Sequence, residues 1–211
     1  MNNHFITIAG NIGVGKSTLT TLLAQKLNWT PFHERVADNP YLADFYGDMG
    51  NWSFHSQMFF LSQRLQQHHR LLQENNSVIQ DRSVYEDAEI FARNLFLQGD
   101  LSQNDWTTYS TLYQALSDLL QPPHMILYLR ASTTTLRRRI NQRGRSYEQS
   151  ISDAYLDQLN VLYDEWIGRF SLCPVLTIET DNLDYVQHDD HLAVIIERMQ
   201  ERLRGKDILA L

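Results

Sequence analysis

The chain has 211 residues, 43% hydrophobic content and a formal net charge of −7. This length suffices for one substantial core, so we expect a single domain over residues 1–211. The acidic balance argues against a surface that holds a polynucleotide backbone, and no apolar stretch approaches the roughly 20 residues of a membrane span. The single cysteine excludes an intramolecular disulfide, and we expect a cytoplasmic protein without polynucleotide or membrane partners.

Short apolar runs alternate with longer segments of helical periodicity along the chain. Strands are predicted at 5–9, 31–34, 77–81, 125–129 and 175–178. Helices are predicted at 17–27, 52–73, 83–97, 104–120, 133–141, 153–170 and 191–203. This alternation predicts an α/β fold with a five-stranded parallel sheet and helices on both faces. Ligands of such sheets collect beyond the carboxyl ends of the strands, so the residues there are the first candidates for a site.

A phosphate-binding loop follows the first predicted strand and precedes a predicted helix. Four residues separate Gly10 from Gly15, and Lys16 and Ser17 follow, which is the pattern of a P-loop NTPase fold. Lys16 is expected to bridge the β- and γ-phosphates, and the Ser17 hydroxyl to bind Mg²⁺. The residues predicted to hold the phosphates are Gly10, Asn11, Ile12, Gly13, Val14, Gly15, Lys16, Ser17 and Thr18. The pattern indicates a nucleoside triphosphate site without deciding the reaction.

Acidic residues end the second and third predicted strands. Glu34 and Asp81 therefore belong to the same edge of the sheet, and Arg82 follows directly. Two carboxylates near a triphosphate suggest one that handles an acceptor hydroxyl and one that positions magnesium, and the arginine balances charge on the transferred group. We favour Asp81 as the base, with Ser17 and Asp81 at the metal. The alternative is that Asp81 or Ser83 simply caps the following helix.

Arginines are concentrated near the end of the helix predicted at 133–141. Arg139 and Arg143 are four residues apart, on one helix face, and a glycine then permits a turn that brings Arg145 inward. Such a cluster suits a lid, at about residues 139–149, that closes over the phosphoryl groups. A solvated basic helix face is the alternative. Asp181, just after the last predicted strand, is placed near the adenine of ATP by its position alone.

Together these motifs resemble the deoxyribonucleoside kinase family, and most of all its bacterial deoxyadenosine and deoxyguanosine kinase branch. The most specific parts are the Asp81-Arg82-Ser83 triplet, continued by residues 84–87, and the segment 139–149. The resemblance implies that the γ-phosphoryl group of ATP is transferred, with Mg²⁺, to the 5′-hydroxyl of a deoxyribonucleoside. A purine deoxynucleoside is the first candidate and deoxycytidine the second. The expected catalytic residues are Asp81, Glu34, Arg82 and Lys16.

The resemblance also implies which residues form the acceptor site and that the chain pairs with a second copy of itself. It implies Glu34 and Arg82 beside the 5′-hydroxyl, Tyr46 and Glu148 at the 3′-hydroxyl, and Gln57, Arg64 and Asp87 at the base. The spacing of Gln57 and Arg64, seven residues apart, independently puts both on one helix face, where Asp87 can pair with the guanidinium. The family also suggests a homodimer through the helices at 52–73 and 104–120.

Two other functions are compatible with the phosphate loop. A nucleoside monophosphate kinase, such as a relative of thymidylate kinase, shares the loop, the Asp-Arg pair and the arginine lid, but Glu34 would repel its acceptor phosphate. A nucleotide-dependent regulatory switch would need no acceptor, and the chain has no Asn-Lys-x-Asp guanine signature. The residues leave open the preferred base, the choice between ATP and GTP, feedback inhibition, and which of the two acids accepts the proton.

Overall fold

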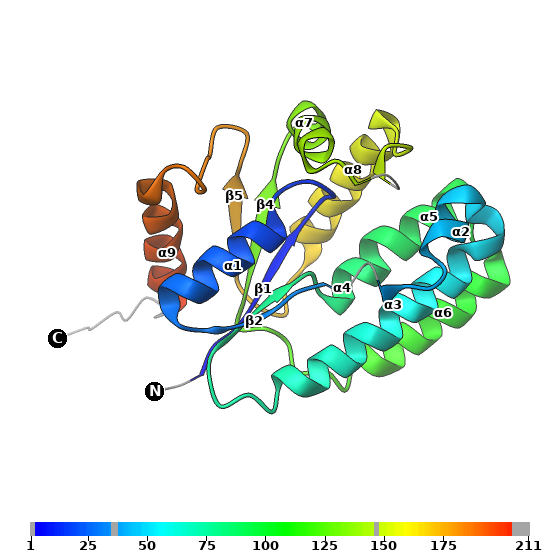
Figure 1. The fold of residues 1–211 in the computed structure, drawn as a ribbon. Helices are drawn as coiled ribbons and strands as arrows, with labels where there is room; N and C mark the ends of the chain where they lie inside the picture. Colours follow the sequence, from blue (N-terminus) through cyan, green and yellow to red (C-terminus); the bar gives the residue numbers. More distant parts are fainter. Residues whose placement is uncertain (1–2, 35–37, 146–147, 204–211) are drawn as a thin grey trace.

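The computed structural model describes residues 3–34, 38–145 and 148–203, which form five parallel strands flanked by helices. The strand order is β2-β3-β1-β4-β5, so β1 lies at the centre (Figure 1). The strands are β1 (Phe5–Gly10), β2 (Thr30–Phe32), β3 (Val78–Asp81), β4 (Met125–Arg130) and β5 (Val175–Glu179). All carboxyl ends meet at one edge of the sheet, which confirms the predicted fold class.

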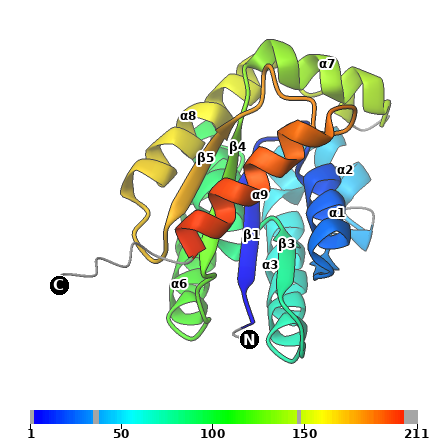
Figure 2. The ribbon, with the colours of Figure 1, turned by 90° about the vertical axis from the view of Figure 1, so that its left-hand side faces the viewer.

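Helices cover both faces of this sheet (Figure 2). One face packs against α1 (Lys16–Leu27) and α9 (Asp189–Leu203). The other face packs against α3 (Met49–Leu71), α6 (Gln103–Ser117), α8 (Asp153–Arg169) and the segment from α4 (Val84–Glu86) to α5 (Arg93–Gln98). Two helices lie near the carboxyl ends of the strands, α2 (Leu42–Gly47) and α7 (Thr133–Arg143). None of the described helices is long and apolar enough to cross a membrane.

The strand β4 shows why helices are needed on both faces. Met125, Leu127 and Leu129 point into the core shared with α1 and α9, while Ile126 and Tyr128 point into the core shared with α3, α6 and α8. Successive side chains of a strand alternate between faces, so a continuous apolar run leaves no face for water. The sheet is therefore packed on both sides, which supports the loops at its edge.

Three elements differ from the sequence-based expectation. The strand predicted at 31–34 ends at Phe32, because only Thr30–Phe32 pairs with β3, so Glu34 lies two residues beyond the strand. The helix predicted at 83–97 contains a π-helical stretch, Asp87–Ala92, between α4 and α5, and apolar periodicity does not reveal such a widened turn. The helix α2 was not predicted, since six residues are too few to show a period.

We expect Leu127→Ala to lower the free energy of unfolding by about 2–5 kcal/mol, because Leu127 is fully buried in β4 and the truncation leaves a cavity. Urea denaturation followed by far-UV circular dichroism measures this loss. Val194→Ala on the exposed face of α9 is the matched control and should change it by less than about 0.5 kcal/mol. Equal losses in the two variants would contradict the placement of Leu127 in the core.

Candidate functional site

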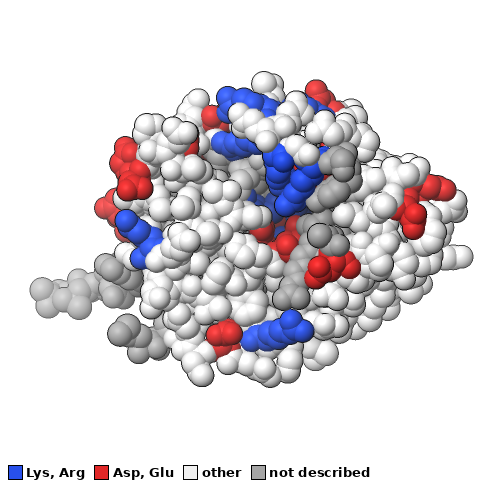
Figure 3. All heavy atoms as spheres, in the orientation of Figure 1, with Lys and Arg blue, Asp and Glu red and all other residues white. Residues whose placement is uncertain are grey.

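A cavity of about 930 Å³ lies at the carboxyl ends of the strands. Figure 3 shows it as a hollow with basic side chains around its upper opening and acidic side chains deeper inside. The predicted site residues that line it are Ile12, Gly13, Gly15, Lys16, Ser17, Thr18, Glu34, Tyr46, Gln57, Asp81, Arg82, Asp87, Arg139, Arg143, Arg145, Glu148 and Asp181. Four predicted residues are not on its wall: Gly10, Asn11, Val14 and Arg64.

The phosphate loop is held in place from both sides. Gly13 has a φ of 82°, and a Cβ there would lie 2.7 Å from the Ile140 Cγ1 atom of α7, so only glycine lets the loop and this helix approach so closely. The Asn11 side chain turns away from the cavity and donates to the Leu156 carbonyl at 2.9 Å and to Asn160 Oδ1 at 2.8 Å. Asn11 thus ties the loop to α8 through its side chain.

The Lys16 ammonium group is buried against the loop. Its Nζ donates to the Gly10 carbonyl at 2.7 Å and to the Asn11 carbonyl at 3.0 Å. Burial lowers the pKa of Lys16 and the Arg82 guanidinium lowers it further, and the nearby carboxylates offset only part of this, so the pKa is about 8. The charge of Lys16 therefore changes near physiological pH.

Ser17 and Asp81 lie together at the tip of β3. The Ser17 hydroxyl donates to Asp81 Oδ2 at 2.5 Å, while the buried Oδ1 atom has no hydrogen-bond partner among the residues that the structure describes. A hydroxyl and a carboxylate are oxygen donors of the kind Mg²⁺ prefers, and magnesium is commonly held by one or two carboxylates together with substrate phosphates. The two residues therefore fit a magnesium ion.

Glu34 is the centre of a buried ion network. Its Oε1 atom lies 3.0 Å from Arg64 Nη2 and 2.9 Å from Arg82 Nε. Burial raises the pKa of Glu34, but the two guanidinium groups outweigh it and lower the pKa to about 2. Arg82 has a φ of 68°, rare outside glycine, and its guanidinium lies 4.2 Å from the centre of the Phe91 ring. Such a conformation persists only where the surroundings hold it.

The predicted pairing of Arg64 with Asp87 is confirmed. The Arg64 Nε donates to Asp87 Oδ2 at 3.0 Å, and its Nη1 donates to the carbonyls of Asp81 and Arg82 at 3.2 Å each. Burial raises the pKa of Asp87, and Arg64 opposes that shift. Gln57 and Asp87 line the cavity, whereas Arg64 is not on its wall. In this structure Arg64 orients Asp87, and its contact with the base stays a prediction.

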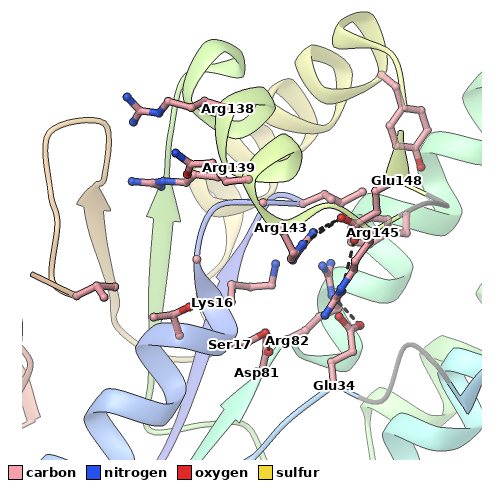
Figure 4. A pocket seen from close by; sticks show the side chains of 18 of the residues that line it. Lys16, Ser17, Glu34, Asp81, Arg82, Arg138, Arg139, Arg143, Arg145 and Glu148 are labelled. Carbon is pink, nitrogen blue, oxygen red and sulfur yellow. Dashed lines mark hydrogen bonds and ion pairs between the residues drawn. The ribbon is translucent and has the colours of Figure 1, made fainter. Parts of the chain in front are cut away.

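The lid arginines have different partners (Figure 4). Arg139 donates to the Val14 carbonyl at 2.9 Å and the Thr180 carbonyl at 2.6 Å, which links α7 to the phosphate loop and to the end of β5. Arg143 donates to Glu148 Oε2 from Nε at 3.0 Å and from Nη2 at 2.6 Å, and Arg145 Nη1 lies 3.4 Å from Glu148 Oε1. Residues 146–147 of the predicted lid lie outside the described residues.

The sequence analysis did not include Glu86 and Tyr163 in the site. Both are fully buried and lie behind the phosphate loop, where the Tyr163 Oη is 2.7 Å from the Gly10 carbonyl oxygen and 2.8 Å from Glu86 Oε1. Glu86 also completes a capping box with Ser83, which is the N-cap of α4 in place of Asp81. The Ser-x-x-Glu spacing could have identified Glu86 as a capping residue. Nothing in the sequence distinguishes Tyr163 from an ordinary core tyrosine on an amphipathic helix such as α8.

Comparison with known proteins gives consistent results. The family model for "Deoxynucleoside kinase" matches residues 6–204. The deoxyadenosine/deoxycytidine kinase of Bacillus subtilis (strain 168) is 36% identical over 199 residues, or 93% of this chain and 92% of that protein. The deoxyguanosine kinase of the same organism is 36% identical over 205 residues, 93% and 96% of the two chains.

A solved structure of deoxyadenosine kinase from M. mycoides with bound dATP has a TM-score of 0.83 and 30% identity, over 94% of this chain and all of that one. A second structure of that protein, with bound dCTP, has a TM-score of 0.81. Fold, sequence and family model therefore agree along nearly the whole chain, and this chain belongs to the deoxynucleoside kinase family.

Proposed function

We propose that this kinase transfers the γ-phosphoryl group of ATP to the 5′-hydroxyl of a purine deoxyribonucleoside, with deoxycytidine as a second acceptor. The observation that carries the proposal is one cavity lined by two unlike sets of residues. The phosphate loop and the lid arginines form one set, while Glu34, Gln57 and Asp87 bring carboxylates and an amide. The similar proteins named above are kinases of deoxyadenosine, deoxycytidine and deoxyguanosine, which supports these bases.

The charges at the acceptor end favour a nucleoside over a nucleoside monophosphate. A monophosphate would need cationic partners there. The two nearest guanidinium groups, of Arg64 and Arg82, are already paired with Glu34 and Asp87. Glu34 is held ionised by these partners and would repel an acceptor phosphate. This argues against the thymidylate-kinase-like alternative.

We infer that Gln57 reads the base and that Asp87 assists it. A glutamine amide offers a donor and an acceptor side by side, which matches the paired acceptor and donor of an adenine edge. Asp87 is fixed by Arg64 and so presents its carboxylate in one orientation. Tyr46 and Glu148 line the same cavity and are proposed to hold the 3′-hydroxyl.

We infer that Glu34 accepts the proton of the acceptor hydroxyl and that Asp81 and Ser17 bind the metal ion. The sequence had favoured Asp81 as the base, but Asp81 Oδ2 already accepts the Ser17 hydroxyl, which suits it to a metal. Both arginines contact Glu34 Oε1, and no hydrogen bond within the described part of the chain reaches Oε2, which makes this oxygen available to an acceptor hydroxyl. Bound Mg²⁺ would neutralise charge on the β- and γ-phosphates. Lys16, Arg143 and Arg145 would bind the phosphate oxygens and orient them.

We also propose a cytoplasmic homodimer that assembles through α3 and α6. These helices pack side by side on the outer face of the molecule; α6 exposes Leu112, and Leu119, in the turn just after α6, is 82% exposed. Exposed leucines on and next to a helix that already covers the sheet are more apolar surface than a monomer needs.

Glu34→Gln should lower kcat by about 10²-fold or more, because an amide cannot accept the hydroxyl proton. Asp81→Asn should instead raise the Mg²⁺ concentration needed for half-maximal rate. Steady-state assays at several Mg²⁺ concentrations separate the two effects. Near-normal turnover in Glu34→Gln, together with loss in Asp81→Asn at every Mg²⁺ concentration, would reverse the two roles.

Gln57→Leu should lower kcat/KM for the preferred purine deoxynucleoside by about 10–100-fold, since a bidentate amide–base contact contributes about 1–3 kcal/mol. The assay compares the four deoxyribonucleosides, their ribonucleoside counterparts and thymidine monophosphate with ATP and magnesium. Gln66→Leu, on an exposed position of the same helix, is the control and should leave the panel unchanged. Activity on thymidine monophosphate alone in the wild-type protein would refute the proposed function.

The apparent second-order rate constant for ATP should fall as pH rises. The pKa of Lys16 is about 8 in the nucleotide-free protein, so the protonated form that attracts phosphates is present below this pH and is lost above it. We expect kcat/KM for ATP to decrease by up to about tenfold per unit above the pKa, while kcat changes less because bound phosphates keep the lysine protonated. A flat kcat/KM profile up to about pH 10 would contradict this behaviour.

A further inference from the structure

The Gln67 side chain lies beside the ion network of Glu34 and is not used by the proposed chemistry. Gln67 belongs to α3, three residues after Arg64, and does not line the cavity. Its amide makes three hydrogen bonds, to His33, Arg64 and Gln80. One side chain therefore connects the segment before Glu34, the arginine that pairs with Glu34, and the strand β3.

The main chain next to Glu34 is held by this amide. The pairing of β2 with β3 ends at Phe32, opposite Gln80, and Glu34 lies two residues beyond that pair. Gln67 Nε2 donates to the His33 carbonyl at 2.8 Å. In the described part of the chain, no other donor reaches that carbonyl, and the main chain of Glu34 has no hydrogen bond. The amide of Gln67 thus supplies a bond that the sheet no longer provides after β2 has ended.

The oxygen of the same amide accepts two hydrogen bonds. Gln67 Oε1 accepts from Arg64 Nη1 at 3.2 Å and from Gln80 Nε2 at 3.1 Å. The donors thus face the amide oxygen and the carbonyl faces the amide nitrogen, as a glutamine side chain requires. Arg64 Nη2 in turn donates to Glu34 Oε1 at 3.0 Å. Gln67 therefore contacts both the backbone that carries Glu34 and a partner of its carboxylate.

Arg64 keeps other partners if the oxygen of Gln67 is lost. These are the carbonyls of Asp81 and Arg82 and the carboxylate of Asp87. The His33 carbonyl has no substitute donor among the residues that the structure describes. The larger effect of Gln67 is therefore on the backbone next to Glu34, and the smaller effect is on the guanidinium.

We propose that Gln67 is a positioning residue for phosphoryl transfer, because it fixes the backbone at His33 and so sets the place of the Glu34 carboxylate relative to the acceptor hydroxyl. A base must lie within hydrogen-bond reach of the proton that it accepts, and a misplacement of about 1 Å can lower a rate about 10²-fold. Gln67 acts through Glu34 and does not itself touch the substrate. The inference rests on the proposed function in that Glu34 accepts the hydroxyl proton.

Gln67→Met tests the proposal, since it keeps the length of the side chain and removes both its donor and its acceptor. We expect kcat with the preferred deoxynucleoside to fall about tenfold, while KM for ATP changes by less than about twofold because the phosphate-binding residues are untouched. Gln66→Met is the matched control, because Gln66 is the exposed neighbour on the same helix, and it should change neither constant. Equal kcat values in the two variants would overturn the proposal.

A double-mutant cycle with Glu34→Gln separates positioning from a general structural role. If Gln67 acts through Glu34, the double variant Glu34→Gln, Gln67→Met should have a kcat within about twofold of that of Glu34→Gln alone. A general loss of structure would instead lower kcat about tenfold in both backgrounds, and this additive result would contradict the proposal.

Failure of this inference is distinguishable from failure of the proposed function. A wild-type protein that phosphorylates no deoxynucleoside, or near-normal turnover in Glu34→Gln, would refute the proposed chemistry, and the role of Gln67 would fall with it. An active wild-type enzyme that loses turnover in Glu34→Gln but keeps it in Gln67→Met would overturn the role of Gln67 alone.

Discussion

The pairing of buried charges around Arg82 is the constraint on which the site depends. Arg82 and Arg64 are both buried and share the carboxylate of Glu34, while Asp87 pairs with Arg64 and Glu86 lies near Arg82. A buried charge without a partner is very unfavourable, so each member of this network fixes the position of the others. The left-handed backbone of Arg82, at a φ of 68°, is held by the same contacts.

The sheet brings these charges next to the phosphate loop. β1 and β3 are neighbours, and Ile8 is in register with Asp81, so the loop after β1 and the triplet after β3 leave the sheet side by side. The strand β2 lies outside β3 and delivers Glu34 two residues after it ends. Parallel strands with both faces covered cannot shift in register without exposing apolar side chains, which makes this edge a stable base for the site.

Two groups of cationic side chains lie at or near the cavity, and the two groups differ in the partners that they contact. At the donor end, Lys16, Arg143 and Arg145 contact carbonyls or Glu148 and can exchange these partners for phosphate oxygens. At the acceptor end, Arg64 and Arg82 are engaged with carboxylates inside the network. In the proposed function, charge that can be redirected would lie near the triphosphate, and charge that is already neutralised would lie near the nucleoside. This division favours an uncharged acceptor.

The sequence by itself determined the α/β class, the phosphate loop and the place of Asp81 at the end of β3, because these depend on local periodicity and on short motifs with a defined geometry. The pairing of Arg64 with Asp87 was also predictable, since one lies on a helix face and the other follows a recognised triplet. Only the tertiary structure decided that Arg64 lies behind the cavity wall, that Asn11 faces α8, and that Arg139 binds backbone carbonyls. It also decided that Tyr163 and Glu86 meet at Gly10, 153 and 76 residues away in sequence. Spacing along a chain specifies which residues share an element, whereas the partner of a buried polar group is set by the packing of elements that are distant in sequence.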